Sequence, residues 1–560
     1  MLRLTNERLG WLVSIALLIL VLYPLLAVVI QVLLPGVFFG NWVIGDLSLL
    51  LEIFKRPLWQ KSLENSLLLG IGTTLIGTLL GGVLATVRST WRFPTAGLLD
   101  AAVWLLLIMP SFILAQGWVM FSAQQGLAVN LFGWDWVPGA VFQPAGLIVI
   151  MTLSKFPLAY LSMKAAMEWK VQQLSDAARL GGASPIKVWA TIQAPLLLPA
   201  LLAGAALVFM DTIGDFGLPS SIAAIYRFPT LPYSIYSALY TSPIRFDMAG
   251  VLSFYLVLLI SVAMLLQFAA MRRSRFDFMS GGAVPSVPKE AGKYRWLLAA
   301  GNIVFLLVII GIPIGSSLMM SFMQAQGGGV KAENLTLDNY AALFDGGFQL
   351  LHGLGRSLMI AASAAVIGLV VGLLVAFVLT YSQFRFRRGI EVLSLVTLAV
   401  PGVVLGIGYI FVWNQRWLEP LGLLLYGKPA ILVLAAIAGA IPVITRIMVG
   451  AMAKVPQSFL HAAGLQGDSL LRRIRRILLP LMRGALLSAG LAAFGASVFD
   501  LAVNSVLFPP NYITFPVAIN KSFEDMRFGY ASAATILGGG VVVAIILVIE
   551  LLFRRKEARS

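Results

Sequence analysis

Few acidic or amide side chains interrupt the long apolar stretches of this sequence. Asp211 and Asp215 lie one helical turn apart near the end of one stretch, and Asp500 and Asn504 repeat this spacing in another. A charge inside a membrane span costs about 2.5–3.5 kcal/mol, so an embedded carboxylate is a candidate functional group. Because oxygen ligands suit a hard cation, these four residues are candidates for a cation path. The alternative is that they cap helices near the outer interface.

The sequence gives little support for other chemistry. It contains no cysteine, which excludes disulfides, thiolate metal sites and cysteine nucleophiles. His352 and His461 are expected on opposite sides of the membrane, so no histidine metal site can form, and no metal site is firmly assigned. Nothing matches the phosphate-binding pattern G-x-x-x-x-G-K-[ST]. We therefore expect a chain that is not an enzyme and binds no cofactor itself.

Two polar segments lie between apolar runs: the first polar segment, "DAARLGGASPIKVWATIQAP" at 176–195, and the second, "HAAGLQGDSLLRRIRRILLP" at 461–480. Each predicts a helix, a break at glycine and a second short helix. In the first segment, Ser184 can cap the second short helix, with Pro185 at the first position of that helix. In the second segment, Gly467 makes the break, and Asp468 or Ser469 can cap the helix that follows. Such an element fits a docking surface. It equally fits an amphipathic loop on lipid headgroups, with Arg472, Arg473, Arg475 and Arg476 as phospholipid contacts.

The composition is that of a polytopic membrane protein. Hydrophobic residues make up 59% and charged residues 11% of the chain, and its mean hydropathy is +0.92, whereas a soluble domain is about a quarter charged. We expect an all-α fold of about twelve transmembrane helices. The apolar runs are long enough to span a bilayer and lie near 10–34, 64–87, 99–121, 143–163, 196–222, 249–271, 296–322, 357–380, 391–413, 429–449, 481–506 and 532–553.

The basic residues indicate an orientation. The formal net charge is +16, and the positive-inside rule explains it without a nucleic-acid partner. If the spans alternate, one side carries most basic clusters and is the cytoplasm; these include Arg3, Arg8, Arg88, Arg92, Arg272, Arg273, Arg275, Arg385, Arg387, Arg388, Arg554, Arg555 and Lys556. Both termini and both polar segments are therefore expected in the cytoplasm.

The chain is an internal duplication. An offset of 285 residues aligns the two polar segments and pairs Asp215 with Asp500, and an offset of 291 pairs Pro110 with Pro401. Because each half has an even number of spans, the halves are expected to run parallel about a pseudo-twofold axis, a topology that favours transport between them. We expect a first half at 1–271, a cytoplasmic linker at 272–295 and a second half at 296–560.

The polar segments resemble the "EAA" signature of ABC-importer permease subunits. The matching residues are Asp176, Ala177, Ala178, Gly182, Ile192 and Pro195, and again His461, Ala462, Ala463, Gly467, Ile477 and Pro480. The resemblance covers essentially the whole chain and implies a type I importer-like permease of the bacterial inner membrane, surrounded by membrane lipids. It implies that each segment is a coupling helix for one of two copies of a separate ATPase, which holds ATP and magnesium. The usual first residue is glutamate, and both Asp176 and His461 depart from it; only Asp176 keeps the carboxylate.

The resemblance also suggests a substrate. Residues 214–240 are similar to the corresponding region of fused ferric iron permeases, close relatives of those for thiamine and organophosphonates. In such systems a periplasmic binding protein delivers the solute, and ferric iron is the expected cargo here. An ion-coupled transporter of six plus six spans is an alternative of another class. The shortage of mid-span Glu, Lys and Arg argues against it.

Overall fold

A computed structural model describes residues 2–35, 37–39, 48–167, 171–226, 228–273, 288–345 and 349–557. This part of the chain is almost wholly helical, which confirms the all-α prediction. Its strands are β1 (Trp91–Arg92) and β2 (Lys289–Glu290), which pair in parallel. Most of the expected linker, at 274–287, lies outside the described residues.

Within the described residues, nine helices are long and apolar enough to cross a membrane, or up to eleven if each bent pair is one span. This agrees with the expectation of about twelve transmembrane helices, although several of the expected apolar runs are broken. Equivalent prolines break two of them: Pro110 separates α5 (Ala96–Ile108) from α6 (Ser111–Ser122), and Pro401 separates α20 (Arg387–Ala399) from α21 (Gly402–Trp413). The residues before these prolines, Met109 and Val400, have extended backbone angles, as is favoured before proline, and end the preceding helix.

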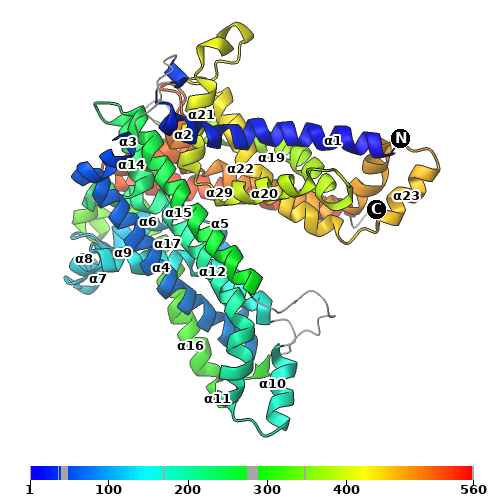
Figure 1. The fold of residues 1–560 in the computed structure, drawn as a ribbon. Helices are drawn as coiled ribbons and strands as arrows, with labels where there is room; N and C mark the ends of the chain where they lie inside the picture. Colours follow the sequence, from blue (N-terminus) through cyan, green and yellow to red (C-terminus); the bar gives the residue numbers. More distant parts are fainter. Residues whose placement is uncertain are drawn as a thin grey trace. The chain divides into compact units, whose positions relative to one another are not determined.

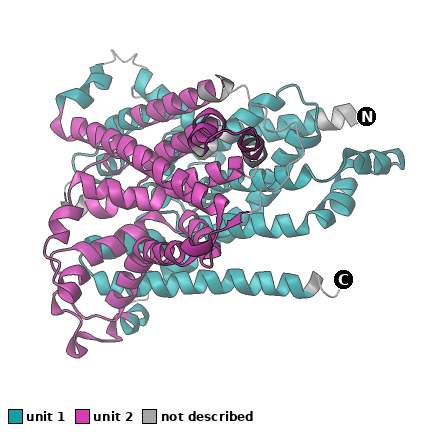
Figure 2. Cartoon of the chain, turned by 90° about the horizontal axis from the view of Figure 1, so that it is seen from below, with its two compact units in different colours: residues 1–55, 235–254, 340–560 teal, residues 56–234, 255–339 magenta. Residues whose placement is uncertain are grey.

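The chain forms two compact units, shown in different colours in Figure 2. Unit 1 comprises residues 1–55, 235–254 and 340–560, and unit 2 comprises residues 56–234 and 255–339. The helices of unit 1 include α1 (Leu2–Leu17), α2 (Tyr23–Leu33), α3 (Ser48–Lys55), α18 (Asp338–Phe344), α19 (Gln349–Tyr381), α20, α21, α22 (Ala430–Met452), α23 (Gln457–Leu465), α24 (Leu470–Arg473), α25 (Leu479–Leu481), α26 (Arg483–Val498), α27 (Leu501–Leu507), α28 (Phe515–Glu524) and α29 (Phe528–Glu557).

Unit 2 is built in the same way from the other parts of the chain. Its helices include α4 (Pro57–Thr90), α5, α6, α7 (Leu127–Phe132), α8 (Val137–Val141), α9 (Pro144–Met167), α10 (Val171–Leu180), α11 (Pro185–Val188), α12 (Ala194–Gly214), α13 (Gly217–Tyr226), α16 (Arg295–Leu306) and α17 (Ile312–Ser321). Three of the described helices have residues in both units: α14 (Leu231–Tyr240), α15 (Phe246–Arg273) and α18, whose first two residues belong to unit 2.

The first span of each sequence half packs in the unit formed mainly by the other half. In unit 2, a Cβ on Gly117 of α6 would lie 2.1 Å from the Pro313 carbonyl oxygen of α17. In unit 1, a Cβ on Gly408 of α21 would lie 2.3 Å from the Pro24 oxygen of α2. Gly117 and Gly408 are equivalent in the repeat, so the two units use the same close contact. The compact units therefore exchange their first spans relative to the halves at 1–271 and 296–560.

Candidate functional site

The first polar segment is a helix, a tight turn and a second helix. Helix α10 ends at Leu180, and the amides of Gly182 and Ala183 bond back to the carbonyls of Arg179 (3.0 Å) and Ala178 (3.1 Å). The chain restarts at α11, where the Ser184 hydroxyl accepts from the Lys187 amide at 3.4 Å. This confirms the predicted cap at Ser184. A π-helical turn, Trp189–Gln193, then leads into α12, with Pro195 in its first turn.

The second polar segment repeats this geometry at equivalent positions. After α23, the amides of Gly467 and Asp468 bond to the carbonyls of Gly464 (3.2 Å) and Ala463 (3.1 Å). Ser469 caps α24 through the Arg472 amide, so of the two predicted capping residues it is Ser469 that acts here. A π-helical turn, Ile474–Leu478, and the short helix α25 with Pro480 in its first turn follow.

Both turns depend on glycine. The bond pattern is a Schellman motif, which needs a residue in the left-handed region at the position after the helix. Gly182 has φ of +82° and Gly467 has φ of +86°. The Ala178 and Ala463 carbonyls accept the outer bond of each motif. The glycine positions of the signature therefore have a local structural reason, independent of any partner.

Each turn exposes the same two apolar positions. Leu180 and its equivalent Leu465 are both 91% exposed, and Ile186 and its equivalent Leu471 are 80% and 76% exposed. Fully burying one such side chain is worth about 1.5–3 kcal/mol. Two pairs of matched apolar side chains at the tips of two matched turns are suited to docking in an apolar groove.

The two polar segments differ in the side-chain contacts that stabilise them. Asp176 forms an ion pair with Lys289 of β2 at 3.7 Å, which connects the first polar segment to the end of the expected linker. His461, at the equivalent position, is exposed and has no ion pair within the described residues. In the second segment, Arg473 is 8% exposed and donates to the carbonyl oxygens of Asp468 (2.8 Å) and Leu460 (3.4 Å). Arg473 therefore stabilises the turn through buried hydrogen bonds and is not available as a phospholipid contact.

The candidate cation residues of the first half surround a lysine. The Lys155 ammonium of α9 lies 2.7 Å from Asp211 Oδ2 and 2.6 Å from Asp215 Oδ2. The side chains of Lys155 and Asp215 are 11% and 4% exposed, and that of Asp211 is 51% exposed. Asp215 Oδ1 accepts from the Ser111 hydroxyl at 2.8 Å and the Leu218 amide at 3.1 Å. Asp215 thus both caps the start of α13 and pairs with a buried cation.

Asp500 occupies the equivalent helix break in the second half. Its Oδ1 accepts from the Val503 amide at 3.1 Å, so it caps α27, and Asn504 is buried with its amide donating to the Asp500 carbonyl oxygen. Alanines stand at the positions equivalent to Lys155 and Asp211. Asp215 and Asp500 belong to different compact units. Their capping bonds match the alternative that the sequence left open for these residues.

Lys155 is the functional candidate that sequence reasoning missed. It stands near the middle of the apolar run at 143–163, where an ionisable side chain by itself signals a functional group. Its presence weakens the sequence argument that mid-span cations are scarce. Among the described residues, no group of three or more His, Cys, Asp or Glu side chains could hold a metal ion.

Comparison with known proteins places the repeat in a family. The model of the binding-protein-dependent transport system inner membrane component matches residues 74–275 and again 368–559. The ferric transport system permease protein FbpB of Actinobacillus pleuropneumoniae is 24% identical over 97% of this chain and 77% of that protein. The putative ferric transport system permease protein FbpB 1 of Haemophilus influenzae is 24% identical over 85% and 73%.

A single-half relative matches as well. The molybdenum transport system permease protein ModB of Escherichia coli is 30% identical over 34% of this chain and 81% of that protein. The two family matches each include one of the polar segments, and their equivalent turns have the same bonds. The chain therefore belongs to the family of binding-protein-dependent transport system inner membrane components, as an ABC-importer permease with two fused halves.

Proposed function

We propose that this chain is the membrane subunit of an ATP-driven importer of ferric iron, in which each polar segment docks on one of two copies of a separate ATPase. The observation that carries this proposal is the repeated turn, with Leu180 and Leu465 each 91% exposed at its tip. ATP and magnesium belong to the ATPase, since the sequence has no phosphate-binding loop. The family supports delivery of the solute by a periplasmic binding protein.

The same arrangement supports a cytoplasmic location for both termini. The start of α1, the end of α29 and helix α23 lie at one end of unit 1 (Figure 1). In unit 2, α10 and α11 lie beyond the ends of α4 and α12 (Figure 1). If the polar segments face a cytoplasmic ATPase, the two termini face it as well.

The choice of iron follows two relatives that cover most of the chain. Both fused relatives named above are ferric transport permeases by name, and they align with 97% and 85% of this chain. Thiamine and organophosphonates remain alternatives from the sequence resemblance. Asp211, Asp215, Asp500 and Asn504 are the candidates for the substrate path, with Lys155 added by its contacts.

An ion-coupled transporter is the competing mechanism, and the ion pairs of the buried Lys155 with Asp211 and Asp215 are the observation in its favour. Buried charge pairs of this kind relay protons in some transporters. Reconstituted vesicles separate the two mechanisms. The proposal expects uptake only with ATP and the ATPase; uptake driven by a proton gradient without ATP contradicts it.

Docking is tested by co-purification from native membranes. We expect the tagged chain to retain an ABC ATPase, and the double variant Leu180→Asp with Leu465→Asp to lose it, because the new carboxylates cannot enter an apolar groove. Both positions are so exposed that the fold should be unaffected. Leu337→Asp is the control, since Leu337 is 67% exposed outside the polar segments. Retention of the ATPase by the double variant would refute docking through these tips.

A further inference from the structure

A polar cavity of about 680 Å³ lies in unit 1, between the start of α19, the loop after α27, α28 and the start of α29. Helix α19 has 33 residues, a length of about 50 Å at ~1.5 Å per residue. At the far end of α19, the Tyr381 hydroxyl donates to the Met452 carbonyl oxygen, near the second polar segment. The cavity is therefore at the face of unit 1 opposite that segment. Its volume lies in the range of small-molecule sites, about 300–1,000 Å³.

Three permanent cations line this cavity: Arg356, Lys521 and Arg527. None of them forms an ion pair with a carboxylate of the described residues. Each is held over an aromatic ring, with Arg356 at 4.7 Å from Tyr512, Lys521 at 4.7 Å from Phe508 and Arg527 at 4.3 Å from Tyr530. Contacts with a ring face orient a cation without neutralising it, so the charges remain available to a ligand.

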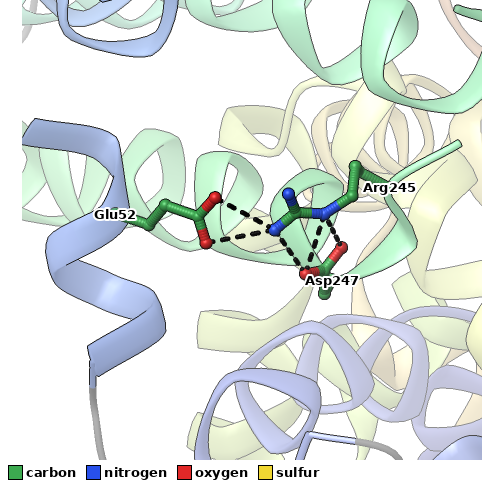
Figure 3. Close-up of polar contacts among 3 residues, drawn as sticks. All are labelled: Glu52, Arg245 and Asp247. Atoms are coloured by element: carbon green, nitrogen blue, oxygen red, sulfur yellow. Dashed lines mark hydrogen bonds and ion pairs between the residues drawn. The ribbon is translucent and has the colours of Figure 1, made fainter. Parts of the chain in front are cut away.

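The duplication supplies an internal comparison for one of these cations. Arg245 is the counterpart of Arg527, because "RFDMAG" at 245–250 and "RFGYAS" at 527–532 correspond in the duplication. Arg245 donates to Asp247 at 2.7 and 2.8 Å and to Glu52 at 3.1 and 3.2 Å (Figure 3). These hydrogen bonds, to Asp247 first and then to Glu52, raise the pKa of Arg245. The first copy is neutralised by two carboxylates, whereas the second copy lines a cavity without such a partner.

The turn that presents Arg527 is strained. Met526 has φ of +58°, in the left-handed region that a side chain rarely adopts, and is 71% exposed. Its amide bonds to the Phe523 carbonyl oxygen, and the Arg527 amide bonds to that of Ser522. The motif is the one that Gly182 and Gly467 make with glycine. A strained residue of this kind is found where a site requires a fixed geometry.

We propose that this cavity is a binding site for a multivalent oxyanion, a polycarboxylate or a phosphate. Arg356, Lys521 and Arg527 would donate charge-assisted hydrogen bonds from three different elements. In an importer of ferric iron, the site would hold the oxyanion that accompanies the metal, and this last assignment rests on the proposed function. The oxyanion site itself rests only on the cavity and its cations.

Two carboxylates also line the cavity, Asp345 and Asp525, and their removal tests whether the ligand is an anion or a cation. A negative charge in the lining opposes an anion and favours a cation. Asp525→Asn should therefore strengthen oxyanion binding, while Lys521→Gln and Arg527→Gln should weaken it. A site for a cationic ligand would show the reverse order.

The experiment is calorimetric titration of the full-length chain in lipid nanodiscs with citrate, ferric citrate and inorganic phosphate. We expect binding of at least one of these anions, a loss of about tenfold or more for Lys521→Gln or Arg527→Gln, and tighter binding for Asp525→Asn. Arg416→Gln is the matched control, because Arg416 is an exposed arginine of unit 1 outside the lining. Thermal unfolding confirms that each variant is folded.

Comparing the probes distinguishes a site for the free anion from a site for its metal complex. Similar affinities for citrate and ferric citrate identify a site for the free anion, and a preference for ferric citrate identifies the metal complex; either supports the oxyanion site. No binding of the three probes, or binding that Lys521→Gln and Arg527→Gln leave unchanged, overturns it. Because titration needs neither ATP nor transport, oxyanion binding without ATP-driven iron uptake would refute the proposed function and leave the site standing.

Discussion

Replacing Lys155 with Met removes the cation between Asp211 and Asp215 and keeps a long unbranched side chain. Asp215 is only 4% exposed, and leaving one partner of a buried ion pair uncompensated costs about 3–5 kcal/mol. The side chain of Asp211 is 51% exposed, so its share is at most about 1 kcal/mol. The bonds from Ser111 and Leu218 to Asp215 remain. We therefore expect Lys155→Met to lower the free energy of unfolding by about 3–5 kcal/mol, mostly through Asp215.

A second substitution in this background locates the loss. Asp215→Asn removes the uncompensated charge and, since asparagine caps a helix as well as aspartate, should recover most of the stability. Asp211→Asn should recover about 1 kcal/mol or less. Denaturant unfolding of the purified chain in detergent measures each value. A loss below about 1 kcal/mol for Lys155→Met, or equal recovery by the two asparagine variants, would refute the account of this buried pair.

Further predictions concern the turns and the path. Gly182→Ala and Gly467→Ala should each destabilise the turn by about 1–2 kcal/mol, because both glycines have positive φ. ATP-driven uptake should fall while membrane insertion stays normal. Gly484→Ala is the control, because a Cβ there meets nothing within 4 Å; uptake equal to that of the control would contradict the prediction. Asp215→Asn with Asp500→Asn should lower iron uptake several-fold with both helix caps retained. Uptake is measured per folded chain, because Asp215→Asn also leaves Lys155 paired with Asp211 alone. Unchanged uptake in vesicles would remove these residues from the path. Lys289→Ala removes the ion-pair partner of Asp176 and should increase the amount of co-purified ATPase if Lys289 and the ATPase compete for Asp176. An unchanged amount would show that this ion pair does not affect docking.

The polar segments could be predicted in detail because their structure is local. Glycine at a helix end and serine before a restart act within a few residues, and Gly182, Ser184, Gly467 and Ser469 took these roles. The sequence could not say which residues would be exposed. That depends on the packing around each turn, which buries Arg473 and leaves Leu465 outside.

The broken spans and the buried lysine required tertiary information. Hydropathy alone predicts continuous spans at 99–121 and 391–413, and the breaks follow from prolines whose effect inside a helix depends on their neighbours. The partners of Lys155 lie 56 and 60 residues further along the chain, and no spacing rule links them. The exchange of first spans is likewise set by contacts such as Gly117 with Pro313, which a pattern within one segment does not encode.

The most direct test of the central claim uses the absence of cysteine. Leu180→Cys and Leu465→Cys each give a chain with one reactive thiol at the tip of a polar segment, and Leu337→Cys gives a control thiol elsewhere. Labelling with a water-soluble maleimide is measured on the purified chain in detergent, with and without the co-purifying ATPase. We predict that the thiols introduced at the two tips are labelled only when the ATPase is absent, while labelling of the control thiol is unaffected by it. Labelling of both tips that the ATPase leaves unchanged would contradict docking at these segments.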